Sequence, residues 1–181
     1  MEPRKISAKL RLALNLLIGI FVLVLTLSFF FGFITILRKG VSENTPITLT
    51  LFDLLDYNDP LLMLAFVSAI MTIICGLVII VITALEITGR IHSELVKDIF
   101  GVASMVFAIL SFILILVYCK QNTPDTNTAT SYLKFVPAAW SYVLLIAGIG
   151  VGVTSLIDTP VMIEDSTRRK NGKAKSKKTN L

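Results

Sequence analysis

The sequence predicts an all-α integral membrane protein, a bundle of four transmembrane helices with both termini in the cytoplasm. Three observations support this fold class: a general shortage of charged residues, four long apolar blocks, and an uneven distribution of basic residues. The chain has 181 residues, of which 55% are hydrophobic and 16% are charged. A soluble domain carries about 25% charged residues.

Four apolar blocks account for the shortage of charge, because none of them contains Asp, Glu, Lys, Arg or His. The blocks cover residues 16–37, 61–85, 99–119 and 135–157. A helix crosses a bilayer with about 20 apolar residues, so each block is long enough. We therefore predict spans at about 12–37, 61–85, 99–119 and 135–157. They form one domain, residues 1–160, followed by a basic tail, 161–181, that we expect to be disordered in water.

The connecting segments carry local signals of their own. Residues 47–51 alternate like a short strand, and residues 51–56 form a short amphipathic helical pattern. Asp59 followed by Pro60 is a typical helix start. The segment Glu86–Asp98 is predicted to be a water-facing link or a pair of helical extensions into solvent, and residues 121–131 an exposed loop.

Basic residues predict the orientation. With four spans, the side that holds both termini has thirteen Lys and Arg residues, and the other side has four. Bases accumulate on the cytoplasmic side of membrane proteins, so both termini are expected there. All four Tyr residues and the single Trp lie near the outer ends of the spans, where such rings settle at the level of the lipid headgroups. No glycosylation sequon is present. We expect a plasma membrane, with a bacterial-type inner membrane favoured.

Small residues recur every three or four positions within the spans and so share helix faces. Such faces let membrane helices approach closely. The predicted helix-packing or interface residues are Gly148, Gly152, Gly101, Ser104, Ala108, Ala65, Ala69 and Gly76. Two interpretations stay open: tight packing within the chain, or a lateral interface with a partner or a second copy.

The spans contain no ionisable side chain, whereas ion-coupled transport usually depends on buried ionisable groups. A path for a neutral solute, lined by Ser68, Thr72, Ser104 and Ser111, remains an alternative. Catalysis has little support, because His92 is the only histidine and no nucleophile, base or metal-ligand set is evident. We expect no enzyme activity, cofactor or metal. Asp53, Asp56 and Asp59 are interpreted as the polar face and cap of the loop helix rather than as a cation site.

The basic tail is the last candidate site. Seven bases follow the fourth span within eleven residues, a pattern that favours contact with anionic lipid headgroups. They are Arg168, Arg169, Lys170, Lys173, Lys175, Lys177 and Lys178. The alternative is a tail that only orients and solubilises the chain. No nucleic acid is expected, because no aromatic residues alternate with the bases.

The arrangement of four spans and two outer loops resembles claudin-like and MARVEL-type tetraspan proteins. The first outer loop lacks the Trp and paired Cys of claudins, so no functional residue is transferred from the resemblance. We expect a non-enzymatic multi-pass protein that acts through lateral helix or outer-loop contacts in a membrane assembly, as a scaffold or accessory subunit or as a homo-oligomer. The alternative is a transporter or channel component for a neutral or lipidic solute.

Overall fold

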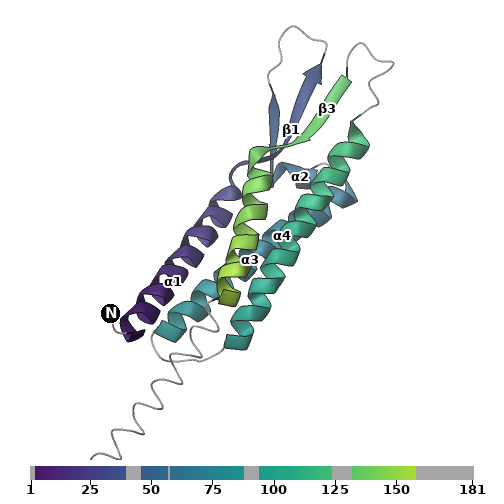
Figure 1. Cartoon of the computed structure of the whole chain (residues 1–181). Helices are drawn as coiled ribbons and strands as arrows, with labels where there is room; N and C mark the ends of the chain where they lie inside the picture. The colour runs from purple at the N-terminus through teal and green to yellow at the C-terminus, as the bar shows by residue number, and fades with distance from the viewer. Residues whose placement is uncertain (1–2, 40–45, 57, 88–93, 124–131, 158–181) are drawn as a thin grey trace, which may run out of the picture.

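A computed structural model of the protein shows long helices lying side by side, with a small antiparallel sheet at one end (Figure 1). It describes residues 3–39, 46–56, 58–87, 94–123 and 132–157. The elements are α1 (Pro3–Ser28), β1 (Gly32–Lys39), β2 (Ile47–Thr50), α2 (Asp53–Asp56), α3 (Pro60–Ile87), α4 (Glu94–Asn122), β3 (Tyr132–Pro137) and the final helix (Ala139–Ile157). We call the end with the strands the sheet end. The opposite end, where α3 stops and α4 begins, is the linker end.

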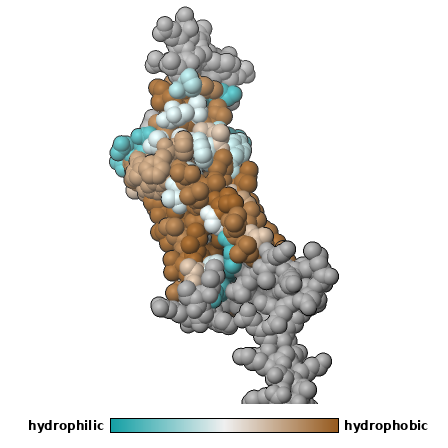
Figure 2. Space-filling view, turned by 90° about the vertical axis from the view of Figure 1, so that its left-hand side faces the viewer, coloured by the Kyte–Doolittle hydropathy of each residue, from teal (hydrophilic) through white to brown (hydrophobic). Residues whose placement is uncertain are grey.

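Within these described residues, three helices are long and apolar enough to cross a membrane: Pro60–Glu86, Leu95–Asn122 and Ala139–Ile157. Figure 2 shows a largely hydrophobic surface on the side of the bundle where α1 lies, with paler residues toward the sheet. The prediction of a membrane protein is confirmed. Four spans are not shown, because the apolar part of α1, Leu12–Ser28, is shorter than each of these three helices.

The prediction of an all-α fold with a first span over 12–37 is wrong. α1 stops at Ser28, and three successive turn hydrogen bonds carry the chain through Phe29, Phe30 and Phe31 into β1. Gly32 is required at this corner, because a Cβ there would lie 2.7 Å from the Cβ of Thr48. The predicted span 135–157 is also shortened, since residues 135–137 belong to β3.

The sheet takes β2 from the first predicted outer segment, whereas β1 and β3 overlap the outer ends of the predicted spans 12–37 and 135–157. Its order is β2-β1-β3, with β1 antiparallel to both neighbours. Ile36 stands opposite Ile47 on one side and Phe135 on the other, so these residues share one face. Most of that face is buried against the rest of the protein at Ile34 and Leu49. The three strands therefore form one unit.

Two local predictions in the first outer segment are confirmed. β2 occupies most of the predicted strand 47–51, and α2 lies within the predicted helix 51–56. Leu51 and Leu54 are buried, whereas Leu55 is exposed. Asp59 caps α3 as predicted, since its Oδ1 accepts hydrogen bonds from the amides of Leu61 (2.8 Å) and Leu62 (3.3 Å).

The turn between β2 and α2 is held by Asp53. The amide and the hydroxyl of Thr50 both donate to Asp53 Oδ2, at 2.7 and 2.8 Å. The Thr50 amide, and after it the Thr50 hydroxyl, lower the pKa of the Asp53 carboxyl from its ordinary 3.8. The ionised carboxylate is thus the form that stabilises the turn.

We predict that acid loosens this turn. The contribution of Asp53 is complete above pH about 4 and is lost as the pH falls through the lowered pKa of the folded state. Hydrogen exchange at the Thr50 amide, divided by its intrinsic rate, should stay constant from neutral pH to about 5 and rise at lower pH. Asp53→Asn should remove this dependence, whereas Asp56→Asn on the same short helix should keep it. An unchanged profile in Asp53→Asn would contradict the assignment.

Candidate functional site

The predicted small-residue faces of three helices meet in the middle of the bundle. A Cβ added to Gly148 of the final helix would collide with the Cβ of Ala108 on α4. It would also lie 3.0 Å from Thr72 Cγ2 on α3 and 3.4 Å from the carbonyl oxygen of Ser104. We call Gly148, Ala108, Thr72 and Ser104 the glycine layer. No side chain larger than hydrogen fits at its centre without displacing a neighbour.

A second close approach lies nearer the linker end. A Cβ on Gly152 would collide with the Met105 side chain and would lie 2.7 Å from the carbonyl oxygen of Gly101. A Cβ on Gly101 would in turn collide with the hydroxyl of Ser155. The backbones of α4 and the final helix therefore touch here, as expected for small residues on facing membrane helices.

The remaining predicted packing residues also lie against other parts of the same chain. Ala65 and Ala69 are buried, and the Ala65 carbonyl oxygen accepts a hydrogen bond of 3.0 Å from the Ser111 hydroxyl on α4. A Cβ on Gly76 would lie 3.1 Å from Val22 of α1. The structure thus places all eight residues at contacts within the bundle, and a role for them in binding a partner stays a prediction.

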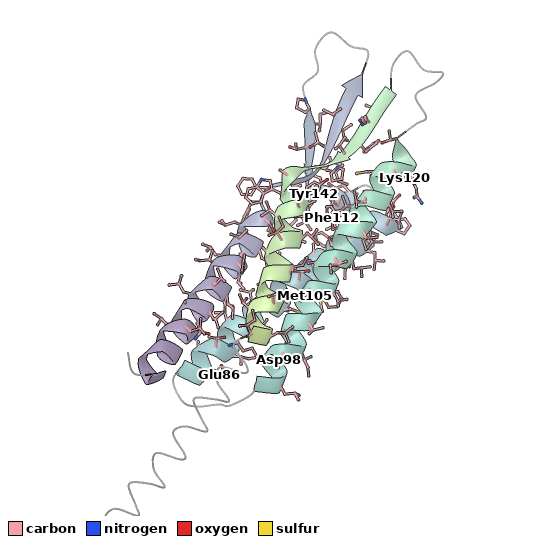
Figure 3. All side chains as sticks on the ribbon, in the orientation of Figure 1. Glu86, Asp98, Met105, Phe112, Lys120 and Tyr142 are labelled. Carbon is pink, nitrogen blue, oxygen red and sulfur yellow. The ribbon has the colours of Figure 1, made fainter. Side chains whose placement is uncertain are left out.

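A buried ion pair lies at the linker end. Lys97 Nζ on α4 is 3.8 Å from Glu86 Oε2 on α3, and both side chains are 1% exposed. The expectation that Glu86–Asp98 faces water is wrong at these two residues, because α3 and α4 continue into the segment and their side chains turn inward. Figure 3 shows Glu86 and Asp98 near each other at this end, with Met105 further along α4.

The ion pair belongs to a polar layer to which three helices contribute. Thr83 precedes Glu86 by one turn on α3 and is buried. Val22 of α1 contacts Gly76 of α3. Two helical turns from this contact toward the linker end, α1 carries Asn15 and α3 carries Thr83, so these two residues lie at a similar depth in the bundle. Within the described part of the chain, Asn15 Oδ1 and Thr83 Oγ1 are buried without a hydrogen-bond partner. The linker end of the bundle is therefore polar inside.

Of the four residues proposed to line a solute path, only Ser111 forms a hydrogen bond to another helix, and Ser104 Oγ is buried without a hydrogen-bond partner in the described part of the chain. Ser68 and Thr72 donate to carbonyl oxygens of their own helix, at 2.8 and 2.9 Å. Ser111 bonds across to α3, and the glycine layer closes the column between Ser104 and Thr72. All four side chains are buried.

Aromatic side chains form a collar at the sheet end, where the tyrosines and the tryptophan were expected. Phe31 stacks on Trp140 with ring centroids 4.0 Å apart, which joins the end of α1 to the start of the final helix. Phe112 contacts Tyr142 at 4.9 Å, and Figure 3 shows both between Met105 and the sheet. Tyr57 and the side chain of Tyr132 lie outside the described residues.

Both edges of the sheet are partly closed by side chains. On β3, the amide of Phe135 donates to Thr123 Oγ1 (3.2 Å), and the Phe135 carbonyl oxygen is 3.3 Å from the same hydroxyl. Pro137 has no N–H to offer. On β2, the Thr50 amide is taken by Asp53, and Pro46 precedes the strand. Such blocked edges disfavour the addition of another strand.

The half of the sheet that is farther from the helices exposes large apolar side chains to its surroundings. Ile47 is 61% exposed and Leu133 is 44% exposed, and both lie on the face that carries Ile36. Leu37, on the opposite face, is 38% exposed. These three residues lie on strands that extend beyond the ends of the apolar helices (Figure 1).

Other candidates remain untested. No group of three or more His, Cys, Asp or Glu residues that could hold a metal occurs in the searched, described ranges. His92 and the seven tail bases, Arg168 to Lys178, lie outside the described residues.

No protein-family model matches the chain, and no curated protein matches it.

Proposed function

We propose that the protein is a non-enzymatic, multi-pass membrane protein that binds another membrane protein, or a second copy of itself, through one face of its outer sheet. The observation that carries this proposal is the exposure of Ile47 and Leu133 on a sheet that stands beyond the apolar helices. In this proposal α1 also crosses the bilayer. Both termini and the linker end are cytoplasmic, because the bases gather there.

Ile47 and Leu133 differ from the exposed apolar residues of the helices because they lie on the sheet. Apolar residues on the helices are covered by lipid, but those on the sheet need a protein partner or must face water. Ile47 is paired with Ile36, four residues beyond the start of β1, which corresponds to roughly 13 Å of strand. Large apolar side chains gathered on one exposed face favour a binding surface.

The geometry supports contact through the face of the sheet rather than through its edges. Thr123 and Asp53 occupy backbone groups that an added strand would need. The same hydrogen bonds connect the sheet to α4 and α2, so the face is held in a fixed position. A preorganised face loses less conformational entropy on binding than a free loop does.

Lipid contacts complete the proposal. The tail bases, Arg168 to Lys178, would lie against anionic headgroups on the cytoplasmic side. A plasma membrane of the bacterial inner-membrane type remains our proposed location. Neither a cofactor nor nucleic acid is part of this function.

A transporter for a neutral or lipidic solute is the second candidate, and the buried Glu86–Lys97 pair favours it. Ionisable groups within membrane bundles often mark transport paths. The contacts in the glycine layer argue against it, because the column between α3, α4 and the final helix is filled there. Solute flux through the purified protein in liposomes would make transport the first candidate function and contact through the sheet the second.

The test is a pair of threonine substitutions on the proposed face. Ile47→Thr with Leu133→Thr keeps residues suited to strands but removes two apolar contacts. We expect the dissociation constant of the complex, titrated by native mass spectrometry in mild detergent, to rise at least about tenfold, as for a contact worth about 1.4 kcal/mol or more.

Leu37→Thr on the opposite face is the matched control and should leave the complex intact. All variants should keep the melting temperature of the unaltered protein. An unaltered protein that is always a lone monomer, or a double variant that assembles normally, would refute the proposal.

A further inference from the structure

We propose that α4 is a rigid lever that couples the Glu86–Lys97 ion pair at the linker end to β3 in the outer sheet. The inference rests on the proposed function, because it makes the contact face of the sheet subject to control from the opposite side of the membrane. It is argued from the two ends of α4 and from the contacts in its middle.

α4 contains no Pro, and its one Gly, Gly101, lies in close contact with Gly152 and Ser155 of the final helix. From Val102 to Asn122 it contains neither Gly nor Pro, which are the usual causes of a kink. Lys97 and Thr123 are 26 residues apart, which corresponds to about 39 Å along a helix. Only 28% of the apolar window of α4 is buried, compared with 44% for α3 and for the final helix. It thus has the smallest buried share of the three spans.

At the sheet end, α4 holds β3 directly. Thr123 Oγ1 is 2.7 Å from the carbonyl oxygen of Cys119 and accepts the hydrogen bond of the Phe135 amide. The Tyr118 ring meets the Phe135 ring edge-on, with centroids 5.7 Å apart. A change in the tilt of α4 would therefore move β3 relative to β1.

At the linker end, α4 is tied to α3 by the ion pair. The pair is buried, so its attraction is screened less than that of a surface pair. Removing the charge from either partner would lower the energy needed to move α4 away from α3 at this end. The rest of the polar layer, with Asn15 and Thr83, can take up water when the pair separates.

The glycine layer supplies the pivot. Ala108, which touches Gly148, lies 11 residues from Lys97 and 15 from Thr123, or about 17 and 22 Å along the helix. Small side chains permit close contacts without interlocking ridges, both here and at Gly101 and Gly152 nearer the linker end, so α4 can turn by sliding over the final helix. A motion of the linker end would then be reproduced at the sheet end in the opposite direction.

The experiment measures hydrogen exchange in β3, residues 132–137, in lipid nanodiscs. Lys97→Met should raise the exchange rate of the Phe135 amide at least about fivefold, and the swap Glu86→Lys with Lys97→Glu should restore it. Thr123→Val should also raise the rate. The combined Lys97→Met and Thr123→Val variant should exchange no faster than Thr123→Val alone, because Thr123→Val already removes the hydrogen bond that connects α4 to β3.

Independent effects would give the product of the two single increases, as sites this far apart normally do. That result, or an unchanged rate in Lys97→Met, would overturn the lever. Lys120→Met on the exposed side of α4 is the control and should change nothing. Protected amides at residues 65–76 in the middle of α3 establish that each variant is folded. If Lys97→Met does not fold, Glu86→Gln takes its place with the same expected results.

Failure of the lever and failure of the proposed function are distinguishable in the same samples. If the Ile47 and Leu133 variant loses its partner while Lys97→Met leaves β3 unchanged, the lever is wrong and the contact face stands. If Lys97→Met accelerates β3 exchange while the Ile47 and Leu133 variant keeps its complex, the contact face is wrong.

Discussion

Replacing Gly148 by alanine is expected to destabilise the protein by about 1–3 kcal/mol, the usual cost of an extra methyl group in a packed core. The new Cβ would collide with Ala108 and press on the backbone of α4 at Ser104. Backbone atoms cannot rotate away as a flexible side chain can, so α4 or the final helix must shift. The measurement is the melting temperature of the purified protein in detergent.

Gly19 of α1 offers the matched control. A Cβ added there meets no atom within 4 Å. Gly19→Ala should therefore be neutral, or stabilising by up to about 1 kcal/mol, since alanine is the better helix former. Gly150→Ala should destabilise the protein less than Gly148→Ala, because the three atoms nearest to its new Cβ all belong to the ring of Phe21, the nearest at 2.6 Å, and a side chain can move aside. Equal melting temperatures for Gly19→Ala and Gly148→Ala would show that the glycine layer does not hold the bundle together.

The long helices were predictable because two independent signals agreed on them. The blocks at 61–85 and 99–119 lack charge over a full bilayer thickness, and small residues recur on one face of each. The observed α3 and α4 contain both blocks and extend them at each end. The capping of α3 was predictable for a similar reason, since Asp59 and Pro60 determine a helix start locally.

The sheet could not be predicted from apolar composition. Residues 32–37 are as apolar as the helix before them, and an apolar run does not distinguish a buried strand from a buried helix. What makes β1 a strand is its pairing with β2 and β3: Thr35 stands opposite Thr48 and Val136, which are 13 and 101 residues away in sequence. The triple phenylalanine and Gly32 were the available signals for the break after Ser28.

The ion pair was missed because charge was taken as a sign of exposure. Lys97 precedes Gly101 by four residues and Ser104 by seven, so it lies on the same helix face as the predicted packing residues. Extending that face by one turn would have placed Lys97 inside the bundle. The Thr123 contact had no such signal, because it depends on how β3 returns to the end of α4.

The glycine layer and the ion pair act at different depths on the same pair of helices. Contacts at Gly148 and Ser111 fix the separation of α3, α4 and the final helix in the middle of the bundle. The Glu86–Lys97 pair determines how the linker ends of α3 and α4 meet. Membrane helices gain little from hydrophobic burial against one another, so close packing and polar bonds must supply the specificity.

Replacing Lys97 by methionine is therefore expected to be the most damaging single loss of charge in the described part of the chain. It leaves the buried carboxylate of Glu86 with less positive charge beside it, and breaking such a pair typically costs about 3–5 kcal/mol. Methionine is close to lysine in length and unbranched, so little of the effect comes from lost volume. The melting temperature in detergent reports the loss.

Replacing both partners separates the role of charge from that of packing. Glu86→Leu with Lys97→Met removes both buried charges, and exchanges of this kind are often neutral or stabilising by about 1–4 kcal/mol. The double variant should therefore melt well above Lys97→Met alone. Lys120→Met, at an exposed position that Figure 3 shows at the far end of α4, should change stability by no more than about 0.5 kcal/mol. If the double variant were as unstable as Lys97→Met, the loss would come from side-chain packing at the linker end, and the electrostatic role of the pair would have to be abandoned.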